Sequence, residues 1–311
     1  MKIGVVGAGK MGGNMAQRWR RGGADVSIFD RSAEARAALA GVAPTRIFAT
    51  LEEIVAALPA PRLLWLMLPA GEPTEQTIAE LLSLLAPGDL VVDGANAHYR
   101  DSQRHAKLLG ERGVAFVDAG VSGGIWGLEN GYGLMLGGDA AAIDRVMPLA
   151  EILAPSPGKG VVHCGPVGAG HFAKMVHNGI EYGLMQAYAE GFALLAARTD
   201  LELPLAEIAG AWCHGTVIRS WLLELTADVL KDRESLSSIS ATVADSGEGR
   251  WAAQEAIDLG IPTPVISAAL MSRFSSQDGG DFADRLLAML RNAFGGHDLL
   301  TQATDSTAPD P

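Results

Sequence analysis

Short apolar runs alternate with helix-like stretches along the first half of the chain. The runs that we interpret as strands cover residues 3–6, 26–29, 63–68, 90–93 and 114–117, and residues 14–21 and 77–85 have the apolar spacing of helices. Short runs that are apolar throughout are typical of parallel strands buried on both faces. The pattern predicts an α/β domain of the Rossmann type, with a doubly wound, mostly parallel sheet.

A helical period replaces this alternation from about Gly165 onward. The stretches expected to be helices are residues 172–198, 205–213, 217–231, 250–259, 265–275 and 282–294. We therefore expect an α/β domain over residues 1–164 and an all-helical domain over 165–300. Residues 301–311 are polar and contain two prolines, and we expect this tail to be disordered.

Three glycines, Gly7, Gly9 and Gly12, follow the first strand and open the first helix. This spacing allows a tight turn, close approach of the backbone to a pyrophosphate and close packing of helix on strand. The amide groups at the helix N-terminus then face the phosphates. We predict dinucleotide binding, with a purely structural glycine turn as the alternative. The expected cofactor-binding residues are Gly7, Gly9, Lys10, Met11, Gly12, Asp30, Arg31, Leu68 and Asn96.

An acidic residue, Asp30, ends the second strand. A carboxylate there can accept hydrogen bonds from the ribose hydroxyls of NAD and repels the 2′-phosphate of NADP. The neighbouring Arg31 leaves NADP open as the alternative, because a guanidinium can pair with that phosphate or stack on adenine. The sequence favours NAD.

One stripe of the long helix over residues 172–198 carries four different polar side chains. Lys174, His177, Asn178 and Glu181 fall at positions i, i+3, i+4 and i+7, so they share one face. The stripe combines a potential base, a potential acid and two groups that could orient a substrate; a solvated helix face is the alternative. The opposite face is expected to pack, with Gly179 and Gly183 allowing close approach, and consists of Met175, Val176, Gly179, Ile180, Gly183 and Leu184.

Composition excludes several classes of protein. The net charge of −12 and the pI near 5.0 argue against nucleic acid or an anionic membrane as partner. No apolar run approaches the roughly 20 residues that span a bilayer, and Met1-Lys2 leads directly into a strand without a signal peptide. Cys164 and Cys213 are expected to be free thiols, and neither they nor the histidines have metal-ligand spacing. We expect a cytoplasmic enzyme that needs no metal.

Several motifs together resemble the 6-phosphogluconate dehydrogenases, and most closely their short form. The matching segments are the glycine turn, Asp93-Gly-Ala-Asn96, Ser122-Gly123-Gly124, residues 170–182 of the long helix and residues 291–297. The resemblance implies oxidative decarboxylation of 6-phospho-D-gluconate to D-ribulose 5-phosphate and CO2, with reduction of NAD or NADP, as in the pentose phosphate pathway.

The resemblance also implies roles for individual residues. Lys174 matches the base that removes the proton of the C3 hydroxyl, Glu181 the acid that protonates the enediol, and Asn178 a further catalytic residue. The matched substrate-binding residues are Asn96, Ser122, Gly123, Gly124, His177, Tyr182, Arg273, Arg291 and His297. In the family, the last two come from the neighbouring subunit, so a homodimer or tetramer is implied.

Some positions depart from the family pattern. Ala95 and Ala97 replace a glycine and a serine, and Ile125-Trp126 stands where acidic residues are usual. Ser246-Gly247-Glu248 replaces a phosphate-binding Lys-Gly-Thr. A non-phosphorylated 3-hydroxy acid, such as gluconate or 3-hydroxyisobutyrate, is therefore the alternative substrate, and a nucleotide-sensing protein without turnover is a second alternative. For Trp126 and Trp251 we expect core packing.

Overall fold

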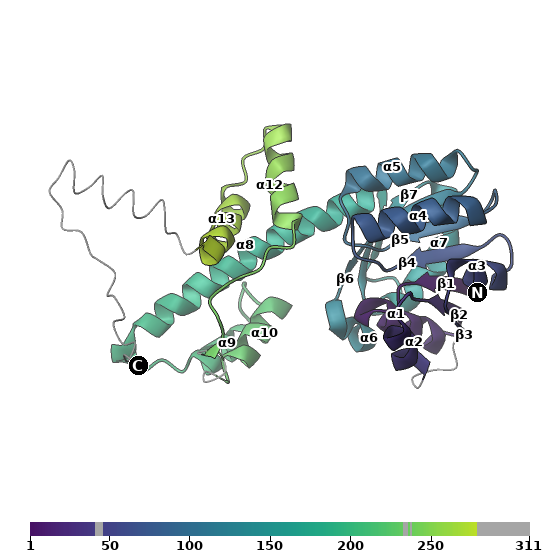
Figure 1. Ribbon diagram of the computed structural model, residues 1–311. Helices are drawn as coiled ribbons and strands as arrows, with labels where there is room; N and C mark the ends of the chain where they lie inside the picture. The colour runs from purple at the N-terminus through teal and green to yellow at the C-terminus, as the bar shows by residue number, and fades with distance from the viewer. Residues whose placement is uncertain (41–45, 233–235, 237, 279–311) are drawn as a thin grey trace, which may run out of the picture. The chain divides into compact units, whose positions relative to one another are not determined.

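A computed structural model describes residues 1–40, 46–232, 236 and 238–278 (Figure 1). Internal contacts divide the chain into unit 1, Met1–Gly179, and unit 2, Ile180–Pro311. The strands are β1 (Lys2–Val6), β2 (Asp25–Phe29), β3 (Arg46–Phe48), β4 (Leu63–Leu66), β5 (Leu90–Asp93), β6 (Ala115–Ser122), β7 (Gly133–Gly138) and β8 (Val161–Gly165).

The helices of unit 1 are α1 (Lys10–Arg21), α2 (Ala33–Ala40), α3 (Leu51–Ala57), α4 (Glu72–Leu84), α5 (Tyr99–Gly110), α6 (Gly127–Asn130) and α7 (Ala140–Leu153), with a 3-10 turn, η1, at Gly124–Trp126. The helix α8 (Ala169–Ala197) begins in unit 1 and ends in unit 2. The remaining described elements are η2 (Thr199–Leu201), α9 (Leu205–Trp212), α10 (Trp221–Val229), α12 (Glu248–Leu259) and α13 (Pro264–Asp278).

Unit 1 is built on one sheet with the strand order β3-β2-β1-β4-β5-β6-β7-β8. The pairs from β3 to β6 are parallel, β6 and β7 are antiparallel, and β7 and β8 are parallel to each other. The chain reverses its direction of winding between β3 and β4, on either side of β1. In such doubly wound sheets, ligands bind at the carboxyl ends of the strands near this switch point.

Alternate residues of each central strand face opposite sides of the sheet, so the sheet has a hydrophobic core on each face. Ile3 and Val5 of β1 belong to the core covered by α1 and α7, whereas Val6 belongs to the core covered by α3, α4 and α5. In β4, Trp65 faces the first core and Leu66 the second. Burial on both sides explains why these strands are continuous apolar runs in the sequence.

The described residues of unit 2 form two smaller clusters of buried side chains. One gathers Phe192 of α8 with residues of α9 and α10, and the other gathers Tyr182 with Ala269 and Leu270 of α13. Gly183 of α8 lies against α13, because a Cβ at this position would be 3.1 Å from Cγ1 of Val265. The expected close approach at Gly183 is therefore confirmed.

The predicted fold class is confirmed, with differences at element boundaries. The helix expected over residues 217–231 begins only at Trp221, because the Ser220 side chain caps it by accepting a hydrogen bond from the Leu223 amide at 3.1 Å. Conversely, α4 begins at Glu72, earlier than expected, with a proline in its first turn. The expected helix over 282–294 and the tail 301–311 lie outside the described residues.

Candidate functional site

The glycine-rich turn between β1 and α1 has the geometry that a pyrophosphate requires. Gly7 has a φ of +104°, and a Cβ there would overlap the Met67 carbonyl oxygen and lie 3.1 Å from the Leu68 side chain. A Cβ at Gly12 would overlap the Gly7 carbonyl, so this glycine lets helix and strand pack closely. The space beside Gly9 is open. Here the backbone can approach a phosphate, so the residues fit a bound dinucleotide.

Asp30 links the end of β2 to this turn. Its Oδ2 accepts a hydrogen bond of 2.6 Å from the Ala8 amide, and its Oδ1 accepts one of 2.8 Å from the Ser32 amide. Each carboxylate oxygen has a second lone pair that can accept a ribose hydroxyl. Lys10 is exposed at the start of α1, and Met11 packs partly against the core. The structure therefore brings the expected cofactor-binding residues of β1, α1 and β2 together.

The loop after β5 exposes Asn96 between two buried alanines, Ala95 and Ala97. Asp93 Oδ1 accepts a 3.0 Å hydrogen bond from the Ala95 amide, which tightens the turn. A Cβ at Gly94 would lie 2.5 Å from Trp65 Nε1, so the loop can pass close to β4 only with glycine here. The turn therefore places the exposed Asn96 at the carboxyl edge of the sheet.

Ser122 is the last residue of β6, and Gly123 and Gly124 follow it with φ values of +129° and +54°. A side chain at Gly123 would also crowd the Gly131 carbonyl, which would lie 3.1 Å from the added Cβ. Both the backbone conformation and the space thus favour glycine. The turn leads into η1, where the Ile125 carbonyl accepts a 3.2 Å hydrogen bond from Asn14 Nδ2 of α1. This contact ties the Ser122–Gly124 loop to the helix that follows the glycine turn.

The N-terminal end of α8 is anchored to β6 by a buried carboxylate. Asp118 accepts hydrogen bonds from the Gly168 amide at 2.6 Å and the His171 amide at 2.7 Å. A Cβ at Gly120 would overlap the Lys174 Cβ and crowd the Gly170 carbonyl. Asp118 and Gly120 therefore hold α8 directly on the strand whose end is Ser122.

Lys174 is 9% exposed, one turn of α8 beyond His171. Its Nζ lies 3.4 Å from Nδ1 of His177, and that nitrogen lies 3.0 Å from Oδ1 of Asn178. His177 is exposed and Asn178 is half-buried. The three side chains thus form one connected polar group on α8 in unit 1, as the sequence predicts. Glu181, also on α8, is half-buried and belongs to unit 2.

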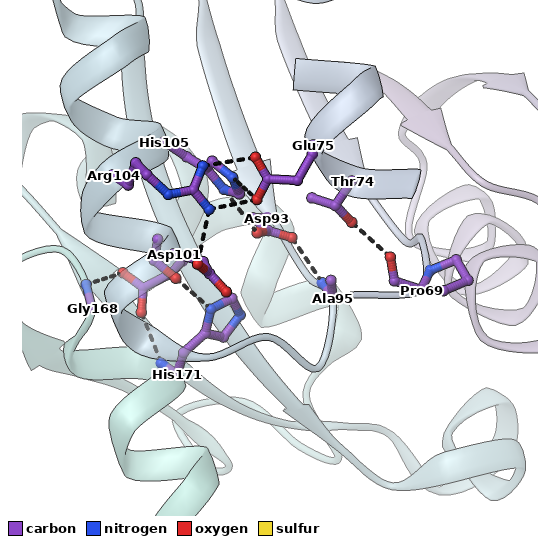
Figure 2. A network of polar contacts seen from close by, with 12 residues as sticks. Pro69, Thr74, Glu75, Asp93, Ala95, Asp101, Arg104, His105, Gly168 and His171 are labelled. Carbon is purple, nitrogen blue, oxygen red and sulfur yellow. Dashed lines mark hydrogen bonds and ion pairs between the residues drawn. The ribbon is translucent and has the colours of Figure 1, made fainter. Parts of the chain in front are cut away.

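A network of polar contacts connects α4, α5 and the end of β5 (Figure 2). Arg104 makes two hydrogen bonds to Glu75, of 2.6 and 2.7 Å, and His105 Nε2 lies 2.8 Å from Glu75 Oε1. Mainly because of Arg104, the pKa of Glu75 is lowered to about 2. On its inner side, His105 Nδ1 lies 4.0 Å from Asp93 Oδ2.

Burial controls ionisation at the centre of this network. Desolvation raises the pKa of Asp93 and lowers that of His171, which favours the neutral form of each. Ser102 Oγ lies 2.7 Å from His171 Nδ1. Desolvation also raises the pKa of Asp118, to about 6, against the opposing effect of the hydrogen bonds from Gly168 and His171. The sequence predicted no role for Asp118 or His171. Its expected strand ended at residue 117, whereas β6 continues to Ser122, so Asp118 is a charged residue within an otherwise apolar strand.

Unit 2 holds a second polar cluster, around Tyr182. The Arg273 guanidinium lies 3.4 Å from the centre of the Tyr182 ring, and the Tyr182 hydroxyl donates to Asp245 Oδ1 at 3.3 Å. Asp245 also pairs with Arg250. The structure thus brings Tyr182 and Arg273 together, as expected from their matched roles, and adds Asp245 and Arg250. Glu248 is buried and accepts a 2.6 Å hydrogen bond from Ser246 Oγ.

Comparisons with known proteins agree with this geometry. Residues 2–165 match the family described as the NAD binding domain of 6-phosphogluconate dehydrogenase, and residues 170–297 match the 6-phosphogluconate dehydrogenase C-terminal domain. The chain belongs to the 6-phosphogluconate dehydrogenase family. The family has members that are named for NAD and members that are named for NADP.

Two relatives of known name and one solved structure illustrate the family. The NAD(+)-dependent, decarboxylating 6-phosphogluconate dehydrogenase of Haloferax volcanii is 42% identical over 96% of this chain and 98% of its own length. The NADP(+)-dependent enzyme of Bacillus subtilis is 38% identical over 88% of this chain and 61% of its own length. The Plasmodium falciparum enzyme, solved in its apo form and with NADP+ or 6-phosphogluconate, has a TM-score of 0.83 at 30% identity, over 98% of this chain and 67% of that chain.

Two expectations about packing are wrong. Trp126 is 55% exposed rather than part of the core, because it lies in η1 at the surface end of the Ser122–Gly124 loop. The expected packing face of α8 is only partly covered. Met175 is buried, whereas Val176, Ile180 and Leu184 are exposed, and Tyr182, expected at the edge of the polar stripe, is buried against α12 and α13. Helix period alone could not show which turns of a 29-residue helix have neighbours.

The remaining expectations concern two residues of the phosphate subsite, metal ligands, membrane helices and the cysteines. Arg291 and His297 lie outside the described residues. Among residues 1–40, 46–232 and 238–278, no set of three or more His, Cys, Asp or Glu side chains could hold a metal ion. Within the same part of the chain, no helix is both long and apolar enough to cross a membrane. Both cysteines are free thiols.

Proposed function

We propose that this protein catalyses the oxidative decarboxylation of 6-phospho-D-gluconate to D-ribulose 5-phosphate and CO2, with reduction of NAD+. The observation that carries the proposal is the packing of α8 on β6. This packing holds the group formed by Lys174, His177 and Asn178 on the same sheet as the glycine turn and the Ser122–Gly124 loop. Membership of the family supplies the reaction.

Lys174 is proposed as the base of the oxidation step. When bound, NAD+ accepts a hydride from C3 of the sugar acid. The Lys174 amine takes the proton of the C3 hydroxyl as the C–H electron pair leaves, so a carbonyl forms at C3. The 3.4 Å contact with His177 Nδ1 supports this role, because it restricts where the amine can point.

The same lysine is proposed to assist the loss of CO2. In the 3-keto acid, the carboxylate is β to the new carbonyl, so the electrons of the breaking C1–C2 bond are delocalised onto the C3 oxygen. The protonated amine of Lys174 stabilises that developing oxyanion and returns its proton to it. Glu181, seven residues further along α8, then donates a proton to C2 of the resulting enediol, while the neutral Lys174 amine takes the proton of the C3 hydroxyl so that the C3 carbonyl forms again. This completes the formation of the keto sugar.

Substrate binding is proposed to involve both polar clusters. Asn96, Ser122, Gly123, Gly124, His177 and Asn178 are assigned to the sugar acid, and Tyr182, Arg273, Arg291 and His297 to the phosphate and distal hydroxyls. In unit 2, the phosphate assignment is supported by the guanidinium of Arg273 stacked on Tyr182. Glu248, the main objection from the sequence, is buried and accepts a hydrogen bond from the Ser246 hydroxyl. This contact does not cancel a negative charge, so the phosphate assignment depends on the Arg273 cation.

The assembly and domain assignments remain part of the proposal. We assign residues 1–164 to the dinucleotide and 165–300 to the substrate and to subunit contacts. A homodimer or tetramer, in which Arg291 and His297 reach the neighbouring site, would complete the phosphate subsite. Measuring the mass of the assembly in solution, with and without the substitution Arg291→Ala, tests this part separately from the reaction.

The test of the reaction is a steady-state assay with NAD+ in which NADH formation and CO2 release are followed together. We expect 6-phosphogluconate to be turned over with equal amounts of NADH and CO2, and gluconate to have a much lower kcat/KM. Preference for gluconate, or NADH formed without CO2, would contradict the proposal and favour a 3-hydroxy acid dehydrogenase.

A further inference from the structure

The Arg31 side chain contacts two polar side chains of α4. One Nη lies 3.1 Å from Glu80 Oε1, and the other lies 3.4 Å from Gln76 Oε1. Glu80 and Gln76 are four residues apart, so they lie on the same face of α4. The two contacts use both terminal nitrogens of the guanidinium, which are the groups that would otherwise form a fork around a phosphate.

The residue before Arg31 marks where the adenosine ribose binds. Asp30 directly follows β2, and in dinucleotide-binding folds an acid at this position accepts hydrogen bonds from the ribose hydroxyls. The 2′-phosphate of NADP would extend from the same ribose. Arg31 is therefore the adjacent cation that could pair with it, unless another group already binds the guanidinium.

We propose that Glu80 is a specificity-determining residue that disfavours NADP by keeping Arg31 paired on α4. This rests on the proposed function, since it concerns the cofactor of that reaction. The pair is about half exposed, with side-chain exposures of 52% for each partner. Exposed ion pairs are weak, so the expected effect on cofactor choice is modest.

A second cation, Arg36, lies close to the same segment. Its Nη1 donates hydrogen bonds to the backbone carbonyls of Asp30 and Arg31, at 2.7 and 3.0 Å. These contacts hold Arg36 on the main chain of the turn. If Arg36 bound the 2′-phosphate, replacing Glu80 would change kcat/KM for NADP even in a variant without Arg31. If Arg31 binds it, that change disappears without Arg31, so the experiment separates the two cases.

The experiment is a double-mutant cycle on Glu80→Gln and Arg31→Ala, read as kcat/KM for NAD and for NADP with 6-phosphogluconate. Glu80→Gln should raise kcat/KM for NADP by about 2- to 5-fold, the range of one exposed ion pair, and change that for NAD by less than twofold. In the Arg31→Ala background, the gain should disappear. Glu72→Gln is the matched control, since it removes one carboxylate from the same helix and leaves the Arg31–Glu80 ion pair in place, although Glu72 touches Gln76, the second partner of Arg31.

A binding readout covers the case in which NADP turnover is too slow to measure. Adenosine 2′,5′-bisphosphate, as an inhibitor competitive with NAD, should bind more tightly to the Glu80→Gln variant by the same factor. The proposal is overturned if Glu80→Gln changes neither kcat/KM for NADP nor the affinity for adenosine 2′,5′-bisphosphate. It is also overturned if Glu72→Gln gives an equal gain, or if the gain persists in the Arg31→Ala background. In each of these cases, NAD-dependent turnover of 6-phosphogluconate continues, so the proposed function stands or fails independently.

Discussion

Unit 1 and unit 2 hold their candidate site residues in different ways. In unit 1, the polar residues are fixed by buried groups on a sheet with a core on each face: Asp118 anchors α8, and Asp93 tightens the Asn96 loop. In unit 2, the buried clusters are small, and Val217, Leu194 and Ile257 are 100%, 73% and 73% exposed. There, Arg273 is held by an aromatic ring and a carbonyl rather than by a buried ion pair.

The proposed function assigns a different task to each arrangement. Chemistry at a fixed bond needs groups that are held rigidly, and a buried carboxylate that accepts two backbone hydrogen bonds provides this in unit 1. The proposed function assigns unit 2 to the phosphate at the far end of a flexible sugar acid, which tolerates a looser arrangement. The exposed apolar residues of unit 2 are also consistent with the proposed subunit contacts.

The largest effect is expected at Lys174. The substitution Lys174→Met should lower kcat by about 10²- to 10⁴-fold, because it removes the proton-transfer group. NAD binding, measured by titration calorimetry, should be unchanged. Lys107→Met, at the last turn of α5, is the control and should retain full activity. Turnover near the wild-type rate in Lys174→Met would reject the base assignment.

Arg273 tests the looser site of unit 2. Arg273→Ala should raise KM for 6-phosphogluconate by about 10- to 100-fold, the range expected for losing a charge-assisted hydrogen bond, with little change in kcat. Gluconate turnover should be unaffected. An equal loss with both substrates would show that Arg273 supports the unit through Tyr182 instead of binding phosphate.

The pH dependence of stability tests whether Asp118 is buried in unit 1. Burial raises its pKa from 3.8 to about 6, so the folded protein holds this proton more tightly than the unfolded chain. Its ionisation therefore costs nothing below pH 4, and it reduces stability as the pH rises to about 6. In Asp118→Asn, this loss is absent, and the variant's free energy of unfolding should rise relative to wild type by about 2 kcal/mol from pH 4 to pH 7.

Urea unfolding at several pH values measures this difference. A difference between variant and wild type that stays constant with pH would show that Asp118 is not buried as described. Kinetics of Asp118→Asn test whether Asp118 positions α8. We expect kcat to fall while KM for NAD stays within twofold, because Asp118 holds α8 and not the glycine turn.

The smallest effect is expected at Glu75, on the surface of unit 1. Arg104 lowers the pKa of Glu75 to about 2, so the ionised carboxylate stabilises the fold above the ordinary carboxyl pKa, and this contribution is lost as the pH falls towards 2. Because the side chain is 36% exposed, Glu75→Gln should cost only about 1 kcal/mol at pH 7. The difference should vanish near pH 2. A cost that persists there would assign the effect to packing.

The sequence by itself determined the fold class and the outline of the site. Strands buried on both faces must be apolar throughout, and a pyrophosphate turn needs glycine at Gly7, Gly9 and Gly12, so both features are local and can be read directly. The stripe of α8 follows in the same way from the helical period.

Only the tertiary structure decided which groups hold that outline in place. Asp118, His171 and Glu80 act through residues at least 49 positions away along the chain, and no local pattern encodes such pairs. Whether a residue is buried, as Asp118 is with its raised pKa, or exposed, as Trp126 is, likewise depends on what packs around it. The sequence period predicts which residues share one face of a helix or strand. Which other elements pack against that face depends on the fold of the whole chain.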